Sequence, residues 1–204
     1  HTAADMIPFG GSFKIGYAPD LDAYGSGNNA GPTQVEGTAT YTGRSATQYQ
    51  VSFDAIPFLD GVKIGADYME FDKQGDEGKR DQDAESGAYY ATYSIGNVSI
   101  GYSKGYLATA IGASADVLES IESTKYSISA NVSDDLSISY EHEESNPDFT
   151  TAATANYTLE STGIQAAYTM GGMTLAIAMN DHENAKYQNG VDIKDTVFSV
   201  AMAF

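Results

Sequence analysis

The chain has 204 residues, 42% of them hydrophobic, with 28 acidic residues against 10 lysines and arginines and a formal net charge of -18. The hydrophobic share excludes a disordered chain, and the negative charge would repel phosphate backbones, so no nucleic-acid partner is expected. Because cysteine is absent, disulfides and thiolate metal sites are excluded as well.

The chain begins with HTAADMIPFGG, which lacks the basic region and apolar core of a signal peptide. We therefore expect a mature chain or a piece of one. No apolar run approaches the roughly 20 residues that a membrane helix needs, which excludes a helical membrane protein.

Polar and apolar residues alternate along most of the sequence, in runs bounded by Gly, Asp, Asn and Pro. A two-residue period is typical of strands, so the chain is predicted to be all-β. In the second run, for example, Tyr49, Val51 and Phe53 fall on one side, whereas Gln48 and Gln50 fall on the other. Ten strands are expected, at about 10–18, 47–56, 61–71, 87–95, 98–106, 123–132, 136–144, 157–170, 173–180 and 194–204.

The expected connections alternate in length. The tight ones are Pro57–Asp60, Gly96-Asn97, Ser133–Asp135 and Gly171-Gly172, and the long polar ones are roughly 19–46, 73–86, 107–122, 145–156 and 181–193. The segment 19–46 is the longest, and 35–43 within it could instead be an eleventh strand. Acidic residues concentrate in or beside the long connections, as Asp72, Asp76, Glu77, Asp81, Asp83, Glu85, Glu143, Glu144 and Asp148.

These acidic residues favour a solvated surface over a binding site. A loosely bound divalent cation at Asp76, Asp81, Asp83 and Glu85 is the alternative, although the order of an EF-hand is missing. The three histidines have no ligand-like spacing, and no resident metal or cofactor is expected.

Short turns at one end, long loops at the other and strands of about ten residues with one apolar face are typical of a transmembrane β-barrel. A soluble β-sandwich would also alternate, but it usually fills its apolar faces with Leu, Ile, Val and Trp. Here those faces contain many of the 15 tyrosines, and tyrosine suits a lipid headgroup boundary. We therefore predict a single antiparallel barrel domain over residues 1–204.

The C-terminal run places Thr196 on one face with Phe198, Val200, Met202 and the terminal Phe204. This ending resembles the assembly signal of bacterial outer-membrane proteins. The hairpins ATYSIGNVSIGYSKG, SANVSDDLSISYEHEE and QAAYTMGGMTLAIAMND, with the terminal strand, resemble the C-terminal part of a Gram-negative general porin of alphaproteobacterial type.

The resemblance implies a barrel of about sixteen strands, of which about six N-terminal ones would be missing here. It further implies a homotrimer in the bacterial outer membrane, in contact with lipid and lipopolysaccharide and inserted by machinery that recognises the last strand. Such porins narrow their lumen with an inward-folded loop. The candidate here is 19–46, with Asp20, Asp22 and Arg44 as constriction residues.

The polar side of the strands is predicted to line a wet channel. Its candidate lining residues are Lys14, Gln48, Gln50, Asp54, Lys63, Asp67, Lys125, Asn131, Glu141, Gln165 and Asp195. A pore needs no catalyst, because polar groups replace part of a solute's hydration while charges set the field across the lumen.

Two motifs suggest other chemistry. Residues 101–105, GYSKG, match a G-x-S-x-G nucleophile elbow, and Asp148 and His182 follow in hydrolase order, but the pentapeptide lies in a predicted strand. Gly25, Gly27 and Ala30 fit a degenerate dinucleotide pattern without the strand-turn-helix that it needs.

We therefore expect a porin without enzymatic activity, which passes small hydrophilic solutes and ions with a mild cation preference. Two alternatives remain open. One is a complete ten-stranded outer-membrane barrel enzyme with its site in the acidic loops. The other is a structural or adhesive surface β-protein whose apolar faces are buried without lipid.

Overall fold

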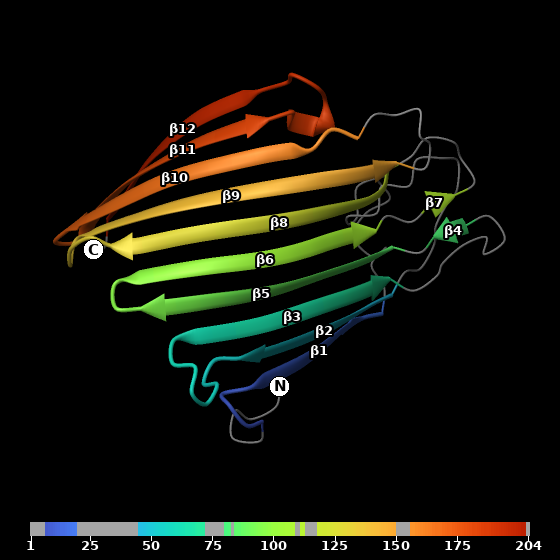
Figure 1. Ribbon diagram of the computed structural model, residues 1–204, viewed down its shortest axis with the longest axis horizontal. Coiled ribbons are helices and arrows are strands. Elements are labelled where there is room, and N and C mark those ends of the chain that lie inside the picture. Colours follow the sequence, from blue (N-terminus) through green and yellow to red (C-terminus); the bar gives the residue numbers. More distant parts are fainter. Residues whose placement is uncertain are drawn as a thin grey trace.

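A computed structural model describes residues 7–19, 45–71, 80–82, 84–108, 111–112, 118–149 and 156–202. These residues form one antiparallel sheet of ten strands, in which each strand pairs with its neighbours along the chain (Figure 1). The strands are β1 (Ser12–Ala18), β2 (Ala46–Phe53), β3 (Val62–Phe71), β5 (Glu85–Ile95), β6 (Val98–Ala108), β8 (Leu118–Asn131), β9 (Leu136–Phe149), β10 (Leu159–Met170), β11 (Met173–Glu183) and β12 (Ile193–Met202).

Two smaller elements accompany the main sheet. Strands β4 (Arg80–Gln82) and β7 (Ile111–Gly112) form a separate pair, and a short 3-10 helix, η3 (Ala185–Tyr187), lies between β11 and β12. The described part of the chain contains no α-helix, and no helix there is long and apolar enough to cross a membrane.

The all-β class and the ten antiparallel strands predicted from the sequence are confirmed. The expected ends of β8 and β9 were wrong, because β8 already begins at Leu118 and β9 continues to Phe149. Asp148 therefore lies in a strand and not in a loop. Glu143 and Glu144, which were counted with the loop acids, lie in the same strand, and all three pair with residues of β8. The suggested strand at 35–43 lies outside the described residues.

The tight connections all lie at one end of the sheet and the long ones at the other, as predicted (Figure 1). Gly96 and Gly171 begin the two-residue turns with φ of 56° and 59°, values that favour glycine. Gly61 also has a positive φ, of 81°, and in addition a Cβ atom there would lie 2.1 Å from the carbonyl oxygen of Ser94.

Pairing in register divides the sheet into two continuous faces. On one face Gln50 lies opposite both Lys14 and Asp67, and on the other Tyr49 lies opposite both Ile15 and Tyr68. Directly opposed residues share a face in an antiparallel pair, so the polar and apolar sides of each strand join those of the next.

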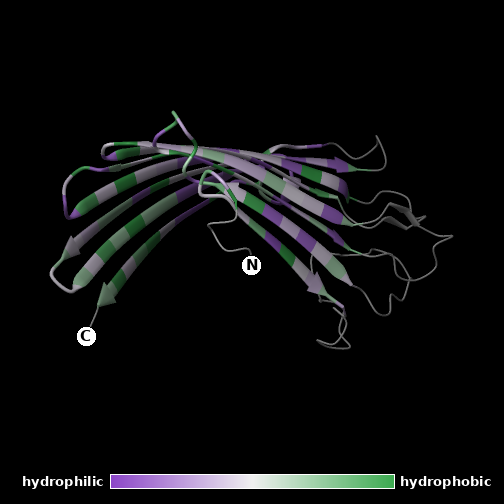
Figure 2. Cartoon of the chain, turned by 90° about the horizontal axis from the view of Figure 1, so that it is seen from below, coloured by the Kyte–Doolittle hydropathy of each residue, from purple (hydrophilic) through white to green (hydrophobic). Residues whose placement is uncertain are grey.

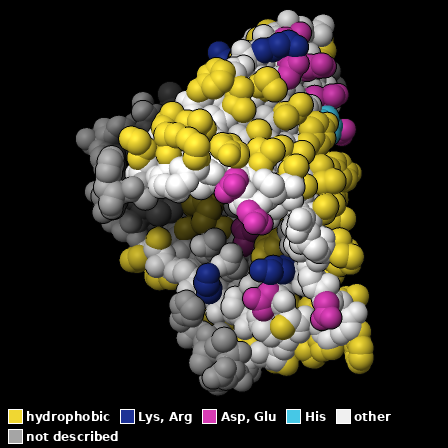
Figure 3. Space-filling view, turned by 90° about the vertical axis from the view of Figure 1, so that its left-hand side faces the viewer, with side chains coloured by type: hydrophobic (Ala, Val, Ile, Leu, Met, Phe, Trp, Pro, Cys, Tyr) yellow, Lys and Arg dark blue, Asp and Glu magenta, His cyan; other side chains and the backbone are white. Residues whose placement is uncertain are grey.

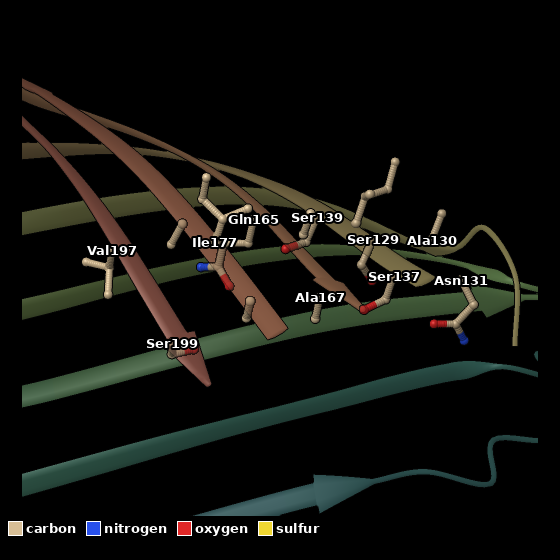
Figure 4. A pocket seen from close by; sticks show the side chains of 14 residues that line it. Ser129, Ala130, Asn131, Ser137, Ser139, Gln165, Ala167, Ile177, Val197 and Ser199 are labelled. Atoms are coloured by element: carbon tan, nitrogen blue, oxygen red, sulfur yellow. The ribbon is translucent and has the colours of Figure 1, made fainter. Parts of the chain in front are cut away.

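The sheet is strongly curved, like an arch (Figure 2). A hollow of about 420 Å³ lies over β8 to β12, where the polar-face residues Ser129, Ser137 and Ser139 point into it and Ala130 points away (Figure 4). The polar face is therefore the concave one. Figure 3 looks onto the tight-turn end and shows hydrophobic side chains along the convex side, at its right.

Within the described residues the sheet covers no conventional core. Among the described residues only Ala46, Ala84 and Ala185 are buried hydrophobics, and no large side chain is fully buried. The sheet is also open within this part of the chain, with β1 and β12 as its edges. Closure into a barrel stays a prediction.

Candidate functional site

The candidate site is the concave polar face. The register brings ten of the predicted channel-lining residues to this face, and Asp54 directly follows β2. The ten are Lys14, Gln48, Gln50, Lys63, Asp67, Lys125, Asn131, Glu141, Gln165 and Asp195.

The structure does not bring every predicted charge pair together. Within the described residues no ion pair joins Lys14 or Lys63 to Asp54, although these were expected to face one another. The proposed constriction residues Asp20, Asp22 and Arg44 lie outside the described residues.

Lys125 is the centre of a charge cluster on this face. Its ammonium group lies 2.9 Å from Glu143 and 3.9 Å from Glu141. The side chains of Lys125 and Glu143 are 41% and 24% exposed, so both remain partly hydrated and the pair contributes little to stability. Glu143 was not among the predicted lining residues because it was counted with the acids of the long loops, although the alternation of Glu141, Glu143 and Ser145 continues the polar side of β9.

A second polar network crosses β10, β11 and β12. The Ser161 hydroxyl lies 2.8 Å from Nδ1 of His182, and Nε2 of the same ring lies 3.7 Å from Asp195. Asn180 donates a hydrogen bond of 2.9 Å to the other oxygen of Asp195. Of these four residues, only Asp195 was predicted as part of the site.

The nucleophile-elbow hypothesis does not fit this arrangement. Ser103 lies in the middle of β6, paired with Tyr90 and Lys125, and the strand continues after it to Ala108, where an elbow would need a turn into a helix. His182 contacts Ser161, on the neighbouring strand, whereas Asp148 lies in β9 on the opposite, convex face.

The convex face consists of bands. Exposed aliphatic residues occupy its tight-turn half, and a row of tyrosines borders them, including Tyr49, Tyr68, Tyr89, Tyr102, Tyr126 and Tyr140. Tyr102 connects two neighbours in this row, with ring centroids 6.2 Å from Tyr89 and 5.3 Å from Tyr126.

Beyond the tyrosines, towards the long loops, the convex face becomes charged. Lys104 forms an ion pair of 3.0 Å with Glu122, and Lys194 forms a short one with Asp181. Further acids of this band include Glu70, Glu85, Glu144, Asp148, Glu160 and Glu183. The apolar part of the convex face is therefore a band of limited height.

The predicted assembly-signal residues lie on the apolar band. Phe198, Val200 and Met202 are 76%, 64% and 56% exposed, and each pairs with an apolar residue of β11. Phe204 lies outside the described residues.

Among the described residues no three His, Asp or Glu side chains are grouped so that they could hold a metal ion. Asp76 and Asp83, two of the loop acids considered for a divalent cation, lie outside that part, and Glu85 accepts a hydrogen bond of 2.7 Å from Tyr68. Comparison of the chain with protein-family models gave no match, and neither did comparison with curated proteins.

Proposed function

We propose that this chain forms the wall of a water-filled outer-membrane channel for passive diffusion of small hydrophilic solutes and ions. The observation that supports the proposal most directly is the two-sided sheet, which has no conventional core in the part of the chain that the structure describes. Large apolar side chains such as Ile15 and Phe198, 61% and 76% exposed, share a continuous convex face, while polar residues share the concave one. A convex face of this kind suits hydrocarbon chains and a concave polar one suits water.

The height of the apolar band supports the same proposal. On β11 the band extends from Met173 to Met179, and Asp181 follows on the same face. At about 3.4 Å per residue this gives roughly 20 Å along the strand, of the same order as the roughly 30 Å that a tilted strand needs to cross the apolar band of about 25 Å in outer-membrane barrels. The tyrosine row then lies where the lipid headgroups would begin.

A closed barrel requires partners for the edge strands β1 and β12. The resemblance to general porins suggests that further strands of the same protein supply them, and that the complete barrel assembles as a homotrimer among lipid and lipopolysaccharide. In this proposal the insertion machinery recognises β12 through Phe198, Val200, Met202 and Phe204.

Permeation through such a wall needs no covalent chemistry. Serines, amides and charged groups of the concave face replace part of a solute's hydration shell as it passes. The charges of β8 to β12 on this face include Glu141, Glu143 and Asp195 against Lys125, so we propose a mild preference for cations. Screening over about 8 Å at physiological salt keeps that preference modest.

The absence of cysteine allows a direct test. Gln165 and Ile164 are neighbours in the middle of β10 and point to opposite faces. Gln165→Cys in a reconstituted bilayer is expected to lose conductance when a charged methanethiosulfonate is added to the aqueous phase. Ile164→Cys is the matched control and should be unaffected.

Two results would contradict the proposal. One is a protein that remains monodisperse without detergent, because its apolar face would then be buried by protein, as in a structural or adhesive surface protein. The other is a membrane-inserted protein without discrete conductance steps.

The Ser161, His182 and Asp195 arrangement favours ester hydrolysis as a second candidate function. Ser161 would attack an acyl carbonyl, His182 would accept its proton and pass it to the leaving alcohol, and water would release the acyl group. Two features make ester hydrolysis the less favoured function. The 3.7 Å between His182 and Asp195 exceeds a hydrogen bond, and β10 pairs on both sides, so its N–H groups cannot form an oxyanion hole.

Hydrolysis of p-nitrophenyl acetate tests this second function. Turnover that is lost in both Ser161→Ala and His182→Ala, but not in Ser139→Ala on the same face, would establish it. Equal background rates in all three variants would exclude it.

A further inference from the structure

Few of the described residues are buried, and all of these except Gly11 lie towards the long-loop end of the sheet. They are Ser45, Ala46, Ala84, Gly87, Ser145, Pro147 and Ala185. Something therefore covers the sheet at this end, and one covering element is visible.

The covering element is the segment 184–192, which connects β11 to β12 and contains η3. The Tyr187 hydroxyl reaches over β10 to the Ser145 hydroxyl of β9, 3.0 Å away. Ser145 pairs with Leu159, and both belong to the concave face, so the segment folds onto the inner side of the arch. Ala185 is 5% exposed, which agrees with close packing there.

The segment is held in this position by its own hydrogen bonds. Asn184 donates from its side chain to the Thr158 carbonyl at 3.0 Å and accepts from the Gly190 amide at 3.0 Å. The Ala185 amide bonds to the Val191 carbonyl at 2.7 Å. These bonds link both ends of the segment to each other and to the residues that precede β10.

Part of the segment has an unusual backbone. Lys186 and Tyr187 have φ of 60° and 57°, in the left-handed region that residues other than glycine rarely adopt. Such conformations persist where the surroundings determine them, and they concentrate at functional positions. Here the conformation places the Tyr187 ring over the concave face.

The geometry points to segment 184–192 as an inward-folded constriction that sets the size limit for solutes at the long-loop side of the channel. This inference rests on the proposed porin function. It differs from the expectation that 19–46 narrows the lumen, because it assigns a size filter to the connection between β11 and β12.

The charge cluster of Lys125, Glu141 and Glu143 is next to this segment, on its tight-turn side. Ser145 and Leu159 form one pair on the concave face, and Glu143 and Ser161 form the next pair on that face. A solute that passes Tyr187 therefore next meets Glu143 with Lys125, and the Ser161 and His182 pair. The selected class is small hydrophilic solutes that fit beside a tyrosine ring, with cations favoured by the adjoining carboxylates.

Tyr187→Ser in planar bilayers and liposomes tests the inference. Removing the ring should raise single-channel conductance by about 1.5-fold or more and admit larger neutral sugars in liposome swelling. Tyr126→Ser is the matched control, because it removes an exposed tyrosine from the convex face. It should leave conductance and the sugar size limit unchanged.

An unchanged conductance and size limit in Tyr187→Ser would overturn the inference while leaving the porin proposal intact. A wild-type protein without conductance would instead defeat the porin proposal before any variant is compared. If Tyr187→Ser does not assemble, Gln188→Cys keeps the ring and places a thiol on the same segment. Modification by a trimethylammonium methanethiosulfonate should then reduce the current, and an unaffected current would also overturn the inference.

Discussion

The ring of Tyr90 lies over Gly65 on the concave face. The two residues are directly paired across β3 and β5, and a Cβ atom on Gly65 would lie 2.5 Å from the ring of Tyr90. Tyr106 covers Gly87 in the same way on the convex face, with a corresponding distance of 2.7 Å. An aromatic ring that covers a glycine in the neighbouring strand compensates for the missing side chain and helps to fix the register.

Gly65→Ala should therefore narrow the channel. The atoms that the new methyl group meets belong to the far end of the Tyr90 side chain, so the ring will rotate away from Gly65, into the space on the concave side, while the backbone stays in place. We expect lower single-channel conductance and a stability loss of about 1 kcal/mol, the scale of one cross-strand pair. Gly16→Ala is the control, because its nearest atom, in Gln48, is 3.6 Å away. Equal conductance in the two variants would contradict this role of Gly65.

Lys125→Met should strengthen cation selectivity. The substitution removes the positive charge that lies 2.9 Å from Glu143 and 3.9 Å from Glu141, which leaves both carboxylates uncompensated on the concave face. The reversal potential in a salt gradient should move towards the cation's equilibrium potential. Lys104→Met is the matched control. It breaks a 3.0 Å ion pair with Glu122, and Lys104 is 38% exposed against 41% for Lys125, but it lies on the convex face. A shift of similar size in both variants would mean that Lys125 does not face the conducting path.

Those features of the site that depend only on the alternation of polar and apolar residues could be predicted from the sequence. Lys14, Gln50 and Asp67 could be assigned to one face because a strand repeats every two residues, and the tight turns then align that face across neighbours. The contact between Ser161 and His182 was missed, although the two-residue turn Gly171-Gly172 fixes it. Counting back from Met170 and forward from Met173 in equal steps leads to this pair.

The contact between Tyr187 and Ser145 could not be predicted by counting residues from a turn. It crosses β10 and depends on how segment 184–192 folds, through left-handed residues that carry no alternating signal. The ends of β8 and β9 were missed for another reason. Glu143, Glu144 and Asp148 are the residues expected of a solvated loop, yet the pairing of β9 with β8 continues past them because each pair adds ladder hydrogen bonds.

Tyr102→Ala should destabilise the membrane-inserted protein. Its ring contacts both Tyr89 and Tyr126. Because an aromatic pair contributes about 0.5–1.5 kcal/mol beyond its buried area, we expect the free energy of unfolding to fall by about 1–3 kcal/mol. Tyr93→Ala removes a tyrosine of the same face that takes part in neither ring contact, and it should cost less. Urea unfolding from lipid vesicles measures both, and a smaller loss for Tyr102→Ala would contradict the stabilising role of the row.

Phe198 and Val197 provide the sharpest test of which solvent each face meets. They are consecutive residues of β12, 76% and 53% exposed, and only Val197 borders the concave hollow. If lipid covers the convex face, Phe198→Arg should cost about 2–4 kcal/mol near the bilayer midplane and reduce insertion. Val197→Arg should insert normally and shift selectivity towards anions, because its charge enters the water-filled side. Folding yield in vesicles and reversal potentials report the two effects. If Val197→Arg is the variant that fails to insert while Phe198→Arg inserts and alters selectivity, the two faces have been assigned the wrong way round.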